Sequence, residues 1–240
     1  MTSDHPAPDG TAMPGSGAWL LARDPDRFLA ASYAGQGRRE ALHGLFALDI
    51  ALGDVIASTR EPMLGEMRLA WWRDALHALD AGPAPAEPVL TALARHVLPA
   101  GVSGAALAAL EDGWLALLDE EPLTEAAIRS HGGMRGGALF ALAGQVLAPG
   151  DDGASARRLG ELWALVDLAV RVSDRHARDI ALRLAGETLA DGRPALPRAL
   201  RPLGALAAIA RRDLRRDLAG RRPGAPGRQL RMLAYMFGGW

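Results

Sequence analysis

The chain has 240 residues, 49% of them hydrophobic, and a formal net charge of −1 at pH 7. A chain of this length and composition can bury one substantial core without a second domain, and its near-zero charge argues against electrostatic binding of nucleic acid. Cysteine is absent, which excludes disulfides, thiolate catalysis and zinc–thiolate sites.

The residue usage favours an all-α fold. Ala and Leu are abundant and aromatic residues make up only 5% of the chain, whereas strands are rich in β-branched and aromatic residues. We expect a disordered tail over residues 1–17, which is rich in Pro, Gly, Ser and Asp, and one helical domain over residues 18–240. Because a secretory signal and a long apolar run are both lacking, we expect no membrane span and a cytoplasmic location, with peripheral membrane contact left open.

The second predicted helix carries two acidic candidates for a functional site. Asp24 and Pro25 are a typical start of a short helix, and a longer helix is predicted over residues 38–58. On a helical projection of the longer helix, Asp49 points inward with the apolar residues, whereas Asp54 lies toward the edge. Asp49 therefore needs a partner for its charge.

The next helix is predicted over residues 61–79, because Pro62 suits the first helical position. Its expected buried face consists of Leu64, Met67, Trp71, Ala75 and Ala78, and is widened by Trp72, Leu76 and Leu79. Arg68 lies among them, so it either extends past the tryptophans into solvent or points into a cavity that holds a carboxylate or an anion. In the second case Asp49 is the expected partner, since a lone inward carboxylate more often meets an arginine than a metal.

The remaining chain also reads as helices joined by loops. The predicted segments cover residues 88–97, 104–118, a short helix from 124, a glycine-rich and then apolar stretch over 130–150, a long pattern over 154–190, a basic helix near 196–220 and a last short helix. The glycines between residues 132 and 137 predict close helix packing, because no strand precedes them and no GK[ST] follows. His131 beside them is interpreted as structural. Short connections favour antiparallel neighbours in one bundle.

Two adjoining segments carry a resemblance to a known family. RREALHGLFALDIALGDVIAS and EPMLGEMRLAWWRDAL, at residues 38–58 and 61–76, resemble the N-terminal half of the squalene/phytoene synthase family. They are more similar to a divergent branch that includes bacterial proteins of unassigned activity and a mitochondrial complex I assembly factor. The resemblance is specific over residues 24–80 and continues more weakly to about residue 220. It implies an all-helical isoprenoid-synthase fold, in which active members join two prenyl diphosphates at Mg²⁺ held by two aspartate-rich motifs.

The first aspartate-rich motif is incomplete in this chain. Aspartates of active relatives align with Gly53, Asp54 and Ala57, so that only Asp54 remains. Mg²⁺ requires oxygen ligands in near-octahedral geometry, and carboxylates four residues apart on a helix supply them from one side. Asp49 faces inward, but Gly53 follows it four residues later. The sequence therefore offers no complete clamp for a divalent ion here.

The second motif falls in GELWALVDLAVRVSDRHARD, residues 160–179. Asp167, Arg171, Asp174 and Arg178 share one stripe of the predicted helix, so carboxylates and guanidiniums alternate along it. Such alternation is typical of a solvated, salt-bridged face. In the other interpretation the stripe lines the cavity, where Arg171 binds a diphosphate or another anion. Neither interpretation builds a metal site.

We predict a family member that has lost Mg²⁺-dependent condensation. It keeps the apolar cavity for a prenyl or lipid-like ligand, or acts with a protein partner in the assembly of a membrane or respiratory enzyme; we assign no catalytic residue, metal, cofactor or nucleic-acid partner. The candidate ligand-binding residues are Asp49, Asp54, Arg68, Asp167, Arg171 and Asp174. The alternative is an active prenyltransferase that condenses prenyl diphosphates, with Mg²⁺ bound by Asp49, Asp54, Asp167 and Asp174.

Overall fold

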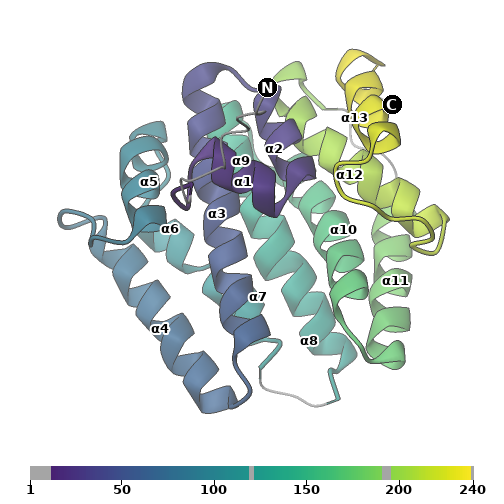
Figure 1. Cartoon of the computed structure of the whole chain (residues 1–240), viewed down its shortest axis with the longest axis horizontal. Coiled ribbons are helices and arrows are strands. Elements are labelled where there is room, and N and C mark those ends of the chain that lie inside the picture. Colours follow the sequence, from purple (N-terminus) through teal and green to yellow (C-terminus); the bar gives the residue numbers. More distant parts are fainter. Residues whose placement is uncertain (1–11, 119–121, 191–195, 239–240) are drawn as a thin grey trace, which may run out of the picture.

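The computed structural model describes residues 12–118, 122–190 and 196–238, which form a bundle of helices (Figure 1). Its longest helices are α3 (Gln36–Ser58) and α10 (Ala154–Arg171). The π-helical segment η2 (His131–Gly137) and its continuation α9 (Ala138–Leu147) pack against α10, and α9 also contacts α3. No strand occurs in these described ranges, so the all-α prediction is confirmed.

Helices from both halves of the chain meet at one end of the bundle, in the upper part of Figure 1. These are α1 (Gly17–Arg23), α2 (Pro25–Ser32), α12 (Arg201–Arg215) and α13 (Pro226–Gly238). Helix α2 contacts α3, α12 and α13, and α12 packs along α10. Residues that are distant in sequence therefore reach the space between α3 and α10.

The remaining helices flank this centre. They are α4 (Pro62–Ala78), α5 (Pro88–His96), η1 (Leu98–Ala100), α6 (Gly104–Ala108), α7 (Glu111–Leu115), α8 (Glu125–Ser130), α11 (Arg175–Ala190) and η3 (Arg198–Leu200). Helix α5 packs on α3, α4 packs on α6 and α7, and α7 packs on η2. The contact between α7 and η2 brings Trp114 to the centre.

Part of the expected N-terminal tail is structured. Helix α1 begins at Gly17, where the Ser16 hydroxyl accepts a hydrogen bond from the Trp19 amide at 3.3 Å. Gly15 is buried against α5, so closely that a Cβ there would lie 2.8 Å from the Cβ of Ala92. Residues 1–11 of the predicted tail lie outside the described residues.

Two predicted helices are divided. The helix expected over residues 104–118 is interrupted by a turn between α6 and α7. The long pattern over residues 154–190 ends at Arg171, because Asp174 caps α11 by accepting a hydrogen bond from the Ala177 amide at 2.9 Å. The stripe predicted from Asp167 to Arg178 is therefore not continuous on one helix.

The prediction for the buried face of α4 was wrong at its centre and right at its edge. Leu64, Met67 and Trp71 are 49%, 63% and 50% exposed, whereas Trp72, Leu76 and Leu79, which widened the expected face, are buried together with Leu69. The reason is steric, because Gly65 on the buried side lets α4 lie close to Leu118, within 2.8 Å of where a Cβ would be. Both sides of α4 carry apolar residues, so periodicity alone does not select the packed one.

Helix α3 is the only candidate for a membrane span among the described helices. By length and composition it is long and apolar enough to cross a bilayer, but 61% of its most apolar stretch of 18 residues is buried inside the protein. Phe46 and its neighbouring leucines on α3 are fully buried in the core. This is the environment of the central helix of a globular domain.

Segment η2 and helix α10 approach each other through glycine. A Cβ on Gly136 would lie 2.2 Å from the carbonyl oxygen of Gly160, and one on Gly160 would lie 2.0 Å from that of Gly136. Backbone therefore packs on backbone at this crossing. The kinked or close-packed helix predicted for this stretch is confirmed, and the short separation lets Arg135 of η2 reach α10.

Candidate functional site

Arg135 occupies the centre of the site. Its guanidinium is 1% exposed and binds Asp49 of α3 in a two-point ion pair, with Nε 2.8 Å from Oδ1 and Nη2 2.9 Å from Oδ2. The same Nη2 also lies 2.9 Å from Oδ2 of Asp167 on α10. One buried cation therefore joins the inward carboxylates of the two long helices, in a geometry that favours arginine over lysine.

His131 orients this guanidinium from the preceding turn. Its Nε2 lies 3.2 Å from Nη1 of Arg135, and its Nδ1 lies 2.6 Å from the carbonyl oxygen of Gly113. Burial and the charge of Arg135 lower the pKa of His131 to about 3. The imidazole is thus neutral at ordinary pH, with Nδ1–H donating to Gly113 and Nε2 accepting from Arg135. The structural role predicted for this histidine agrees with these contacts.

A second buried arginine supports the first carboxylate. Arg27 of α2 places Nη1 3.0 Å from Oδ2 of Asp49 and Nε 3.1 Å from Oδ2 of Asp24. The guanidiniums of Arg27 and Arg135 both contact the ring of Trp163, at 4.7 and 4.9 Å from its centre. Arg135 also lies 4.2 Å from the ring centre of Trp114. Aromatic faces therefore contribute cation–π attraction where water is excluded.

Both inward carboxylates stay ionised because of these contacts. Burial alone would raise the pKa of Asp49, but the charges of Arg135 and Arg27 hold it below its usual range. For Asp167 the charges of Arg135 and Arg171 likewise overcome burial and hold the pKa well below its usual range. Arg171 contributes an ion pair from Nε to Oδ2 of Asp167 at 2.9 Å.

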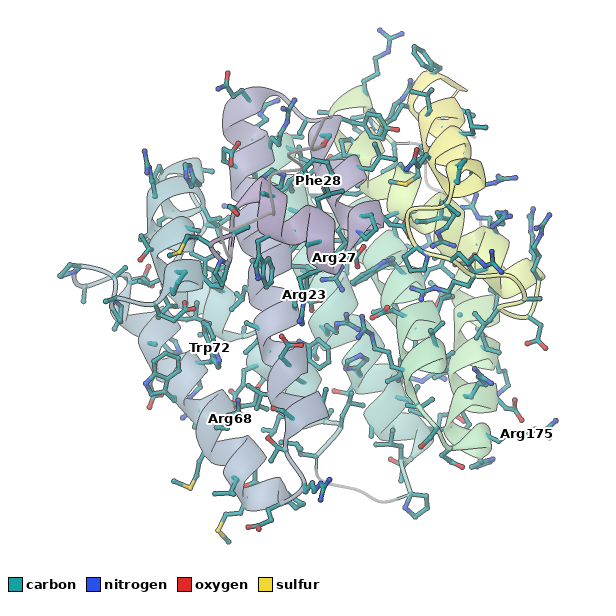
Figure 2. All side chains as sticks on the ribbon, viewed as in Figure 1. Arg23, Arg27, Phe28, Arg68, Trp72 and Arg175 are labelled. Atoms are coloured by element: carbon teal, nitrogen blue, oxygen red, sulfur yellow. The ribbon has the colours of Figure 1, made fainter. Side chains whose placement is uncertain are left out.

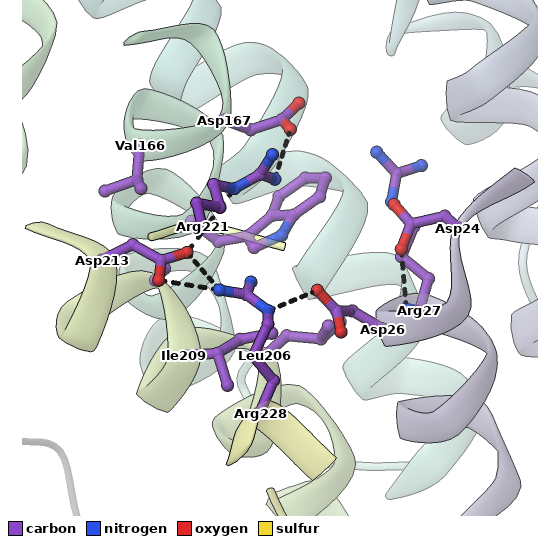
Figure 3. A pocket seen from close by; sticks show the side chains of 12 residues that line it. Asp24, Asp26, Arg27, Val166, Asp167, Leu206, Ile209, Asp213, Arg221 and Arg228 are labelled. Carbon is purple, nitrogen blue, oxygen red and sulfur yellow. Dashed lines mark hydrogen bonds and ion pairs between the residues drawn. The ribbon is translucent and has the colours of Figure 1, made fainter. Parts of the chain in front are cut away.

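The ion-pair network continues into the C-terminal part of the chain (Figure 3). Arg221 lies 3.7 Å from Asp167 and 3.5 Å from Asp213, while Arg228 bridges Asp213 at 2.6 Å and Asp26 at 2.8 Å. The hollow between these groups has a volume of about 20 Å³, which is the space of a water molecule. The network therefore fastens α12 and α13 to the site without leaving room for a ligand here.

These residues do not fit the Mg²⁺ that the family resemblance implies. Within the described part of the chain, no group of three or more His, Asp or Glu side chains is arranged to hold a metal ion. A Cβ on Gly53 would lie 2.8 Å from Cη2 of Trp114, so the indole fills the space of the missing carboxylate. The oxygen atoms that a cation would need are instead bound to guanidinium groups.

Asp49 does not pair with Arg68, the partner that we predicted, but with other arginines. Arg68 is exposed on α4 and donates from Nη1 to the hydroxyls of Ser58 and Thr59 at 3.0 and 3.1 Å, far from Arg23 and Arg27 in Figure 2. Its solvent-exposed interpretation is the one that the structure supports. The expectation that Asp49 pairs with an arginine was correct, but the arginine comes from η2, which is 86 positions away.

The other predicted site residues lie at different depths. Asp54 is half-exposed and paired with Arg23 at 2.6 Å, as its edge position on the projection indicates. Arg171 is exposed and also lines the cavity, so its position agrees with both interpretations of the stripe, whereas the solvated interpretation is wrong for Asp167, which is 5% exposed. Asp174 caps α11 and lines a surface hollow together with Leu117, Leu123 and Arg171, which we call the outer opening.

Two adjoining hollows form the cavity. A polar one of about 280 Å³ is lined by Arg23, Asp24, Arg27, Asp49, Asp54, Arg135 and Arg171, among others. An apolar one of about 410 Å³ is lined by Ile56, Leu117, Leu123, Leu168 and Val172. Both include Gly53, Ala57, Trp114, Arg135 and Arg171 in their walls. Their volume is in the range of sites for small organic ligands, with an apolar body and one polar end.

Sequence reasoning missed the arginines that decide the site. Arg135 stands alone in HGGMRGG, and Arg27 in a short helix near the N-terminus. One signal was available for Arg135: small residues on both sides indicate close packing, so a long side chain there must insert between neighbouring helices. No comparable local signal marks Arg27, because its partner Asp49 lies on another helix.

The neutral His131 makes the fold sensitive to acid. In the unfolded chain this imidazole binds a proton near pH 6.5, but in the folded protein only near pH 3. Between these values the unfolded state binds more protons, so stability is lost as the pH falls, by up to about 1.4 kcal/mol per pH unit. We expect urea unfolding to show a loss of about 2 kcal/mol from this group between pH 7 and pH 5.

The variant His131→Gln is expected to flatten this slope. Burial also lowers the pKa of His43, so His43→Gln is the matched comparison. It should remove a smaller part of the pH dependence of stability, because this ring is less deeply buried. Stability that stays constant in the wild type from pH 7 to pH 5 would contradict the assignment of a neutral His131. Below about pH 4, protonation of Asp49 and Asp167 adds to the loss, because their pKa values are lower in the folded state.

The fold and the cavity together define an all-helical protein of the isoprenoid-synthase type. A family model described as squalene/phytoene synthase matches residues 20–216, and the chain therefore belongs to the squalene/phytoene synthase family. A crystal structure of a dehydrosqualene synthase in complex with ligand is similar, with a TM-score of 0.70 and 16% sequence identity over 92% of this chain and 93% of that one. This likeness shows the fold. No curated protein sequence matches the chain.

Proposed function

We propose that this chain is a non-condensing family member that binds a prenyl or lipid-like ligand in the cavity between α3 and α10. The observation that carries the proposal is the position of Arg135, whose guanidinium holds both Asp49 and Asp167. Condensation of prenyl diphosphates in the family depends, as the resemblance implies, on Mg²⁺ at facing carboxylates. Here Arg135 is already bound to Asp49 and Asp167, the two inward carboxylates of α3 and α10.

The energetic reason is the cost of separating a buried ion pair. For Asp49 and Asp167 to bind Mg²⁺, Arg135 would have to leave a site where it is 1% exposed, and burying an unpaired charge is strongly unfavourable. Mg²⁺ also gives up its own waters reluctantly. The alternative of an active prenyltransferase is therefore the less supported function, although Asp54 and Asp174 lie close to solvent.

A second role, in the assembly of another enzyme, is favoured by the exposed face of α4. Met63, Leu64, Met67 and Trp71 form an apolar ridge with exposures of 72%, 49%, 63% and 50%. Contiguous apolar surface of this kind often marks a contact with a partner. This role matches the assembly function in the divergent branch that the sequence resembles, and it is compatible with ligand binding because the ridge lies outside the cavity.

The proposal is tested by incubating the purified chain with farnesyl diphosphate and Mg²⁺. We expect no hydrocarbon product above the level of a protein-free control, because the carboxylates that would bind the metal are neutralised by arginine. Extracted products are measured by gas chromatography with mass spectrometry. A Mg²⁺-dependent hydrocarbon that is lost in the variant Asp49→Asn would establish the active alternative instead.

A further inference from the structure

The positive and negative side chains at the polar end of the cavity balance each other. Four arginines meet there, namely Arg23, Arg27, Arg135 and Arg171. Three aspartates line the same hollow, namely Asp24, Asp49 and Asp54, and Asp167 accepts ion pairs from two of the arginines. With all groups ionised, these four positive and four negative charges sum to zero, and the adjoining Arg221 and Arg228 are balanced by Asp26 and Asp213.

Every one of these arginines is already paired. At the rim, Arg23 binds both carboxylate oxygens of Asp54 at 2.6 Å. Deeper in the site Arg27 and Arg135 share Asp49, and Arg135 and Arg171 share Asp167. The apparent basic lining therefore does not amount to an open anion site, in contrast to what the number of arginines suggests.

A diphosphate would add several negative charges to this neutral end. No unpaired guanidinium waits for it among the described residues of the wall, so the anion would have to separate an existing ion pair or stay uncompensated, and both are costly in a partly dry site. An uncharged head has no such cost. It needs only a hydrogen-bond donor, because a buried polar group without a partner is unfavourable.

Arg171 can supply that donor. Its side chain is 57% exposed and only its Nε takes part in the ion pair with Asp167. Within the described ranges, neither Nη1 nor Nη2 of Arg171 donates a hydrogen bond to another residue. Arg171 lines the polar hollow, the apolar hollow and the outer opening. Arg171 therefore lies at the junction of the polar and the apolar hollow.

We propose that the cavity takes an uncharged isoprenoid-like lipid, such as an isoprenoid alcohol, in preference to a prenyl diphosphate. The hydroxyl oxygen of the head accepts a hydrogen bond from Arg171, and the apolar chain lies along Trp114, Leu117 and Leu168. This inference deepens the proposed function and rests on it. It adds the class of head group, because a site with balanced charges favours an uncharged ligand.

The experiment compares farnesol with farnesyl diphosphate, each titrated into the full chain without metal and with EDTA present. Calorimetry gives the dissociation constants, and quenching of tryptophan fluorescence gives a second measure of binding, since Trp114 lines the cavity. The titrations are done at pH 8, because burial raises the pKa of Asp24 and a higher pH favours its carboxylate form. We expect farnesol to bind at least 10-fold more tightly than farnesyl diphosphate.

Three variants separate the possible outcomes. Arg171→Met should weaken farnesol binding several-fold. Arg68 is also exposed but lies outside the cavity wall, so Arg68→Met should leave binding unchanged. Asp54→Asn frees Arg23 from its partner and should shift the ratio of affinities several-fold toward the diphosphate. Circular dichroism melts verify that each variant is folded.

Each result decides between the two proposals. Tighter binding of the diphosphate to the wild type, or no shift of the ratio in Asp54→Asn, overturns the preference for an uncharged head while ligand binding itself stands. If neither compound binds, the proposed function falls as well. Farnesol binding that is equal in Arg171→Met and in the wild type overturns the role given to Arg171.

Discussion

Replacing Arg135 with methionine is expected to destabilise the fold by about 3–5 kcal/mol, since removal of one partner leaves buried charge uncompensated. Arg135→Met strips Asp49 of its two-point ion pair and Asp167 of one contact. Methionine fills similar space, so lost packing contributes little of the effect. The free energy of unfolding in urea at pH 7 measures it, provided that the variant still unfolds in a single transition.

The matched control is Arg68→Met, which removes an exposed arginine that bonds only two hydroxyls and should cost less than about 1 kcal/mol. A double-mutant cycle with Asp49→Asn gives the coupling. We expect the double variant to be clearly more stable than the sum of the single changes predicts, because the neutral amide no longer needs a cation. Additive effects would mean that Arg135 and Asp49 do not support each other as the structure indicates.

Adding one methyl group at Gly160 is expected to have the second largest effect. In Gly160→Ala the Cβ would lie 2.0 Å from the carbonyl oxygen of Gly136, so η2 and α10 must separate along their contact. Overpacking against backbone of this kind costs about 2–3 kcal/mol. Separation also draws Arg135 away from Asp167, so the ion pair weakens together with the packing. Thermal and urea unfolding measure the loss.

Gly133 provides the control, because it belongs to the same η2 segment but no heavy atom lies within 4 Å of a Cβ placed there. Gly133→Ala should leave stability unchanged or slightly higher, since alanine is the better helix former. Equal losses in Gly133→Ala and Gly160→Ala would show that the glycines matter for the π-helical backbone itself, and that close approach to α10 is not their main purpose.

Local sequence signals predicted much of the fold because they act within one helix. Asp24 with Pro25 and Pro62 mark helix starts that the structure confirms at α2 and α4, because capping involves only neighbouring backbone groups. The end of α10 at Arg171 escaped prediction although its signal is equally local. Asp174 accepts a hydrogen bond from the Ala177 amide three residues later, but helical periodicity on both sides of the break hides this cap.

Helical phase also predicted the orientation of two acidic residues on α3. It placed Asp49 inside and Asp54 at the edge, and both positions agree with the exposures of 2% and 54% in the structure. It did not identify the partner of Asp49. Arg68 is nearer in sequence, but it lies on the side of α4 that faces solvent, and a one-dimensional pattern does not say which of two apolar faces is packed.

The sequence by itself determined that this chain is helical, that it resembles the squalene/phytoene synthase family, and that glycine and alanine stand where active relatives carry aspartate. Only the tertiary structure decided which cations pair with the inward carboxylates. Arg27, Arg135 and Arg171 come from three separate segments, and their charges are brought together by the approach of α2, η2 and α10. Ion pairing depends on distance in space, whereas sequence periodicity reports only direction around a single helix.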